Sequence, residues 1–112
     1  MLEECPKSPN CVSSFSQNKS HYIKPIEIVG NVNEAREKLI QILKNLHGEI
    51  LQENKDYIKV AFYSKFFKFE DIAEFQIDSN KKIINVRSAA QTGWYDFGVN
   101  RKRIEKIRQE LN

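Results

Sequence analysis

Apolar and polar residues alternate along the middle of the chain, and this period of two predicts two β-hairpins. The strand-like runs cover residues 49–54, 57–64, 69–78 and 81–90. Lys55-Asp56 separates the first pair of runs and Ser79-Asn80 separates the second, and both breaks are polar and of hairpin length. Because the apolar residues of the inner runs share one parity, the sheet is expected to have one apolar face.

A spacing of three to four residues replaces this alternation on both sides of the hairpins and predicts two helices. The first helix begins at Asn31, which with Glu34 has the form of a capping box, and Gly48 is expected to end it in a left-handed conformation. The second helix follows Asp96, a typical N-cap residue. Its predicted buried stripe consists of Phe97, Ile104, Ile107 and Leu111.

The first residues show neither period, so we expect an irregular N-terminal arm at 1–20. Residues 21–29 alternate again, and Pro25 restricts them to an edge strand because proline has no N–H to donate. Together these elements predict an α+β fold, a two-layer sandwich with two helices on one face of a mainly antiparallel sheet of four to five strands. Residues 21–112 form its single domain, and the arm belongs to the same globular unit.

The chain has 112 residues, which is enough for one domain to bury a core without cross-links. No apolar run approaches the roughly 18 residues that span a bilayer, and the N-terminus has no apolar stretch of a secretory signal. We therefore expect no membrane span. The predicted location is cytoplasmic as the sequence stands, and exported or lipid-anchored if a leader has been removed.

Positive charge gathers at the C-terminal end. Residues 79–112 hold eight Lys or Arg against three Asp or Glu, a net charge of +5, whereas residues 1–78 hold ten against twelve, a net charge of −2. A basic patch suits a small anion, an acidic partner or nucleic acid, and a solvated helix face is the simplest interpretation. We do not expect nucleic acid as a partner, because its bases need several exposed aromatic side chains to stack on, and we expect Trp94 and Tyr95 to plug the end of the core.

Cys5 and Cys11 are the only cysteines, and the Pro-containing segment between them could turn and bring them within disulfide range. The spacing is compatible with either of two states, a disulfide or two reduced thiols. Two cysteines do not complete a tetrahedral zinc site, and His21 and His47 lie in unrelated segments, so we expect neither a metal nor a cofactor. Cys11 is the candidate for a catalytic thiol, with His21 as a conceivable base, although we expect His21 to be an exposed residue.

The strongest constellation surrounds the start of the second helix. A helix N-terminus offers free N–H groups, and Asn100 and Arg101 stand in its first turns. The strand that bears Arg87 and Ser88 is expected to end nearby, and together these groups suit a carboxylate or phosphate. The candidate ligand-binding residues are Arg87, Ser88, Asp96, Asn100 and Arg101.

An internal ion-pair network is the competing interpretation of the same residues. In this network, Arg87 or Arg101 would hold the helix to the sheet by pairing with an acidic residue. The possible acidic partners are Asp96, Asp71 and Glu74. Glu70, Asp71 and Glu74 do not predict a metal site, because alternation along a strand places Asp71 on the face opposite the two glutamates.

Four segments resemble one known family. They are CPKSPNCVSS at 5–14, HYIKPI at 21–26, SKFFKFEDIAEF at 64–75 and VRSAAQTGWYDFGVNRKRIEKIR at 86–108. The chain thereby resembles the bacterial and plastid family known as domain of unknown function 1499 over nearly its whole length. The positions that the resemblance marks are Asn10, Cys11, Ser64, Phe69, Asp71, Glu74, Arg87, Ser88, Gly93, Asp96, Gly98, Asn100, Arg101 and Arg103. Ile72 and Gln91 stand where the family pattern often has Asp and Arg, and the resemblance implies no activity.

The sequence therefore favours a small, non-enzymatic binding module that recognises a small anionic ligand or a protein partner near the N-terminus of the last helix. No Gly-rich phosphate loop and no nucleophile motif supports an enzyme. The alternative is a thiol-dependent enzyme or redox protein that uses Cys11. The exposure and reactivity of Cys11 would distinguish the two.

Overall fold

The computed structural model describes residues 2–64 and 69–112, which contain two helices and six strands. The helices are α1 (Val32–Asn45) and α2 (Val99–Leu111). The strands are β1 (Cys11–Ser13), β2 (Ile26–Glu27), β3 (Glu49–Glu53), β4 (Tyr57–Tyr63), β5 (Glu70–Asp78) and β6 (Ile83–Ala90).

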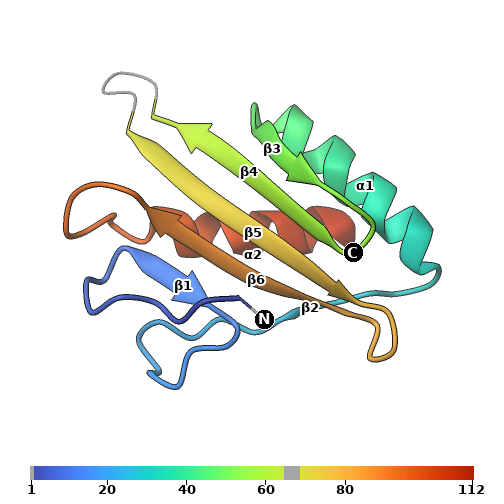
Figure 1. The fold of residues 1–112 in the computed structure, drawn as a ribbon, viewed down its shortest axis with the longest axis horizontal. Coiled ribbons are helices and arrows are strands. Elements are labelled where there is room, and N and C mark those ends of the chain that lie inside the picture. Colours follow the sequence, from blue (N-terminus) through green and yellow to red (C-terminus); the bar gives the residue numbers. More distant parts are fainter. Residues whose placement is uncertain (1, 65–68) are drawn as a thin grey trace.

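The strands form one antiparallel sheet in the order β1-β6-β5-β4-β3, and β2 pairs with the start of β6. Both helices lie behind the same face of this sheet (Figure 1). The predicted α+β sandwich and its two hairpins, β3–β4 and β5–β6, are confirmed. The six strands exceed the four to five expected because β1 forms inside the arm, where no period marks it.

The core lies between the helices and the sheet, and it fixes α2 at the site described below. Its fully buried side chains include Phe75 and Ile84 of the sheet, Leu39 and Leu43 of α1, and Ile104 and Ile107 of α2. Burial of each such side chain stabilises the fold by about 1.5–3 kcal/mol. The position of α2 therefore follows from its apolar stripe.

The opposite face of the sheet, towards the viewer in Figure 1, is only partly covered. Leu2 of the N-terminal arm is buried on this face, where it lies near Ile72 of β5 and Arg87 of β6. The arm is thus tied down at its start. Beyond it the face holds a polar depression of about 680 Å³.

The end of α1 differs from the prediction. Asn31 accepts a hydrogen bond from the Glu34 N–H at 3.0 Å, as expected, but the left-handed residue after the helix is His47, with φ 65°, and not Gly48. Gly48 is needed for a different reason, because a Cβ atom there would lie 2.6 Å from Cγ2 of Val60. The glycine allows the chain to pass close to β4.

The segment between β6 and α2 also differs from the prediction. Trp94, Tyr95 and Phe97 are 66%, 59% and 76% exposed, so the first two do not plug the core and Phe97 does not belong to the buried stripe. The helix begins only at Val99, because Phe97 and Gly98 take positive φ angles of 56° and 75°. These two residues turn the chain before the helix starts, and they leave Phe97 outside the helical face.

Candidate functional site

Asp96 occupies the N-terminus of α2 from a position just before the helix. Its carboxylate accepts hydrogen bonds from the N–H groups of Gly98 at 2.9 Å and Asn100 at 3.1 Å. Its carbonyl oxygen accepts a third from the Val99 N–H at 3.1 Å. An anion bound at the helix N-terminus would use the same N–H donors. The Asp96 carboxylate therefore already occupies the position that such an anion would take.

Asn100 is fully buried and joins segments that are distant in sequence. Its side-chain amide donates to the Asp96 carboxylate at 2.8 Å and to the Asn10 carbonyl oxygen at 3.4 Å. Its Oδ1 accepts from the Ser88 hydroxyl at 2.6 Å and from the Arg103 guanidinium at 2.9 Å. The side chain thus uses its hydrogen-bonding capacity within the protein and fixes α2 to β6.

Arg103 is the cation of this network, a role that the sequence did not predict. Its guanidinium lies 3.0 Å from the Asp71 carboxylate of β5 and 4.5 Å from the ring centre of Phe62. The Arg103 and Asp71 side chains are only 16% and 15% exposed, so solvent screens the pair weakly. The ion pair between the last helix and the sheet, considered above for Arg87 or Arg101, is made here by Arg103.

The structure brings together three of the five candidate residues, namely Ser88, Asp96 and Asn100. Arg101 points elsewhere and donates a hydrogen bond to the Ser20 carbonyl oxygen at 3.1 Å. With Asp96 it lines a pocket of only about 180 Å³. The space beside Arg101 is therefore too small for more than a few atoms of a ligand.

Arg87 lies on the opposite face of the sheet, since neighbouring residues of a strand point to opposite sides. Its guanidinium is 3.8 Å from the Glu74 carboxylate, which also accepts a hydrogen bond from the Tyr57 hydroxyl. Burial, and then the bond to Glu74, raise the pKa of Tyr57 above the ordinary tyrosine value. Any ligand at Arg87 would occupy a site separate from the start of α2.

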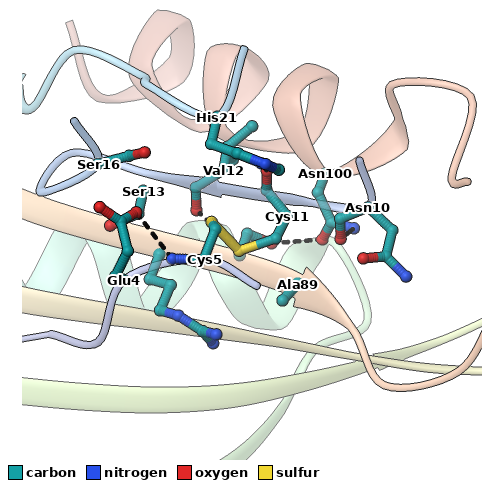
Figure 2. The surroundings of a disulfide bond; sticks show 12 residues. Glu4, Cys5, Asn10, Cys11, Val12, Ser13, Ser16, His21, Ala89 and Asn100 are labelled. Carbon is teal, nitrogen blue, oxygen red and sulfur yellow. Dashed lines mark hydrogen bonds between the residues drawn. A yellow bond between two sulfur atoms is a disulfide. The ribbon is translucent and has the colours of Figure 1, made fainter. Parts of the chain in front are cut away.

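Cys5 and Cys11 form a disulfide, with their Cα atoms 5.7 Å apart. Cys11 is 1% exposed in β1 and faces Ala89 of β6, as Figure 2 shows. His21 is buried, contrary to expectation, and its Nδ1 lies 3.0 Å from the Cys11 carbonyl oxygen. Of the two states left open by the spacing, the structure has the disulfide, so a Cys11 thiolate would first require reduction.

Within residues 2–64 and 69–112, no group of three or more His, Cys, Asp and Glu residues could hold a metal ion. Asp71 shares its sheet face with Ala73 and Phe75, whereas Glu70 and Glu74 lie on the other face, as alternation along the strand predicts.

A groove of about 730 Å³ runs along the first two turns of α2. The end of α1, strand β4 and helix α2 line it with Leu46, His47, Phe62, Tyr63, Val99, Lys102, Arg103 and Lys106. Phe62 is buried beneath the Arg103 guanidinium, so the accessible apolar surface of the groove is that of Val99 and Tyr63, which are 43% and 49% exposed. The groove can therefore receive an apolar group.

Three cations of α2 stand along one wall of the groove. Arg103 is paired with Asp71, and Lys106 has Glu110 at 3.8 Å in an exposed pair. Lys102 is exposed and has no ion-pair partner among the residues that the structure describes. Its charge is therefore available to a ligand.

Neither Arg103 nor Lys102 was among the candidate ligand-binding residues, although the family resemblance marks Arg103 and the strand pattern holds a second signal for it. Asp71 shares its parity with Ala73 and Phe75, so it is a carboxylate on the face that the helices cover. A buried carboxylate requires a cation from a covering helix, and Arg103 stands three residues after Asn100 on the same helical face.

These features define a small α+β domain whose last helix is held to the sheet by a buried polar network. The family described as "Protein of unknown function (DUF1499)" matches residues 1–111, so the chain belongs to this family. Comparison with curated proteins finds no match. In the described part of the chain, no helix has the length and apolar character needed to cross a membrane.

Proposed function

We propose that this domain is a binding module for a small amphiphilic anion, a molecule with an apolar part and a carboxylate or phosphate. The observation that carries the proposal is the unpaired Lys102 in a groove that also exposes the apolar side chains of Val99 and Tyr63. An apolar group would lie against these side chains while the anion meets the ammonium group. This ligand sits near the N-terminus of the last helix, as the sequence favours, but it uses Lys102 in place of Arg87 or Arg101.

The walls of the groove support binding because they are held before a ligand arrives. Phe62 belongs to the core, and Arg103 is fixed by Asp71 and Asn100. A ligand would have to order only the side chains of Lys102 and Lys106, which limits the entropic cost of binding. The start of α2 itself is a poorer anion site, since Asp96 already uses its N–H groups.

Thermal unfolding tests the proposal, because a ligand that binds only the native state raises its melting temperature. Decanoate and decyl phosphate, below their micelle-forming concentrations, should raise it, whereas inorganic phosphate and decanol should not. Lys102→Gln should weaken the binding of both anions up to about five-fold, because an exposed ion pair contributes at most roughly 1 kcal/mol. Lys81→Gln, which changes an exposed lysine at the β5–β6 turn, is the matched control and should respond as the native protein does.

An equal stabilisation by decanol would show that the groove takes apolar groups without regard to charge. An unaltered response of the Lys102→Gln protein would remove Lys102 from the site. The alternative based on Cys11 stays a prediction, and thiol titration after reduction of the disulfide is its test.

A further inference from the structure

Exposed apolar side chains are concentrated at one end of the molecule. Among the described residues, nine large hydrophobic side chains are exposed, and six of them adjoin the start of α2 or the β4–β5 hairpin: Tyr63, Phe69, Trp94, Tyr95, Phe97 and Val99. These segments are neighbours, because Tyr63 pairs with Glu70, whose carbonyl oxygen accepts a bond from the Gln91 N–H at 2.9 Å. Figure 1 shows the connection between β6 and α2 projecting beyond the strands at this end.

Trp94, Tyr95 and Phe97, here called the aromatic tip, stand on an anchored backbone. The Asn10 side chain donates to the Gly93 carbonyl oxygen at 2.8 Å on one side of the tip, and Asp96 binds the start of α2 on the other. The rings of Tyr95 and Phe97 meet edge to face, with their centres 4.9 Å apart. The backbone is thus held while the rings point outwards.

Phe97 is unfavourable for the fold in two respects. Its φ of 56° lies in the left-handed region, where a side chain other than that of glycine is strained, and its ring is 76% exposed. A glycine would remove both defects. The ring therefore points to a contact outside the chain.

Cations lie behind the tip. Arg101, Lys102 and Lys106 follow on α2, which runs away from this end behind the sheet (Figure 1). At 1.5 Å per helical residue, Lys102 lies about 5 Å and Lys106 about 10 Å beyond Val99. In a bilayer, a headgroup layer of about 5–8 Å covers the hydrocarbon. With the tip at the hydrocarbon boundary, Arg101 and Lys102 therefore lie at the depth of the headgroups, and Lys106 lies just outside them, close enough to be attracted by an anionic surface.

We infer that the aromatic tip docks the domain on an anionic lipid bilayer, with Trp94, Tyr95 and Phe97 in the interfacial layer and the cations of α2 among the headgroups. Trp and Tyr are favoured at this interface, and Lys and Arg are attracted to its negative surface. Such peripheral docking needs no spanning helix. A protein partner is the poorer occupant, because a stable protein interface takes about 800 Å² from each side and the tip is a projecting loop.

The chain has one tryptophan, so the emission of Trp94 reports directly on the tip. With vesicles of phosphatidylcholine and phosphatidylglycerol in equal amounts, we expect its emission to move to shorter wavelength and its quenching by acrylamide to fall. Vesicles of phosphatidylcholine alone, or high salt, should weaken both effects. Arg101→Gln, outside the groove, should weaken binding about five-fold, as expected for one cation near an anionic surface.

Phe97→Gly separates docking from folding. It should raise the melting temperature by removing the strained φ, and it should weaken co-sedimentation with the vesicles about ten-fold or more by removing the ring. Val29→Ser is the matched control, since Val29 is 79% exposed but lies outside the tip, and it should bind as the native protein does.

Unchanged Trp94 emission with the anionic vesicles, or equal binding by the Phe97→Gly protein, would overturn the inference. Shielding of Trp94 that grows with protein concentration in the absence of vesicles would assign the tip to a second copy of the chain instead. The inference goes beyond the ligand groove and can fail separately from it. The tip residues do not line the groove, so Phe97→Gly should keep the response to decanoate.

Discussion

Arg101 and Arg103 are two residues apart, yet they act on different parts of the molecule. Arg101 touches the arm through the Ser20 carbonyl oxygen, whereas Arg103 enters the gap between α2 and the sheet and binds Asp71 over the Phe62 ring. A shift of two residues on a helix turns a side chain by about 200°, which explains the difference. The charge of a residue therefore does not show which arginine holds the helix to the sheet. Its position on the helical face does.

Substitution of the two arginines should separate these roles. Arg103→Ala leaves the largely buried Asp71 carboxylate without its cation, so we expect the free energy of unfolding to fall by about 2–4 kcal/mol. Arg101→Ala should change it by no more than about 0.5 kcal/mol. Urea unfolding measures both values. Adding Asp71→Asn to Arg103→Ala should recover part of the loss, and a larger effect at Arg101 would contradict the assignment.

At the scale of elements, strands β4, β5 and β6 carry a row of polar contacts on the less covered face. The Tyr57 hydroxyl donates to Glu74, and Glu74 faces Arg87 across the β5–β6 pair. Because burial disfavours the charged phenolate and the bond to Glu74 requires the neutral phenol, the folded protein holds the Tyr57 proton more tightly than the unfolded chain does.

The raised pKa of Tyr57 predicts a loss of stability in alkali. Below the ordinary tyrosine pKa of 10.0 both states are protonated and the contribution is fully present. Above it the unfolded chain loses the proton first, so stability falls as pH rises towards the folded pKa. Tyr57→Phe should show a shallower fall above this pH in urea titrations. Identical pH profiles for the two proteins would contradict the role of the phenol.

The loop closed by the disulfide supports the connection that carries the aromatic tip. Asn10, next to Cys11, accepts a bond from the Ala90 N–H at 2.9 Å and donates to the Gly93 carbonyl oxygen at 2.8 Å. Two elements far apart in sequence are therefore fixed together by one asparagine.

Removal of the disulfide should weaken this support without abolishing the fold. The combination of Cys5→Ser with Cys11→Ala, which avoids a buried hydroxyl, should lower the free energy of unfolding by about 2 kcal/mol, since the closed loop is short. Hydrogen exchange of the Ala90 amide should become faster, whereas exchange in the middle of α1 should follow only the global loss. Unaltered exchange at Ala90 would show that Asn10 holds its place without the disulfide.

At the scale of the whole molecule, the layers, hairpins and helices could be predicted from periodicity, because long apolar patterns determine which faces are buried. The period of apolar residues could not predict the backbone conformation at single residues where the chain turns. His47 and Phe97 take left-handed angles that their residue types rarely adopt. Gly48 was therefore the better prediction at the end of α1, and Phe97 was assigned to the helical stripe. Strand β1 has three residues, too few to show a period.

The candidate site could be predicted only in part. The residues at the start of α2 were found because capping and charge are local signals, and the structure joins Ser88, Asp96 and Asn100. Arg87 was grouped with them from its place in the sequence, although its neighbour Ser88 points to the opposite face. The groove involves α1, β4 and α2, so it depends on tertiary packing that no short segment encodes.

The pairing of β1 and β2 with β6 limits the order in which the chain can fold during synthesis. Both strands lie within the first 27 residues, and their partner begins at residue 83. The ribosome releases them early, but they have no strand to pair with until most of the chain has emerged. The intervening elements can meet sooner, because shorter loops separate them. Strands β1 and β2 are therefore fixed late although they precede β6 in the chain, and Cys11 is not buried until β6 has been made.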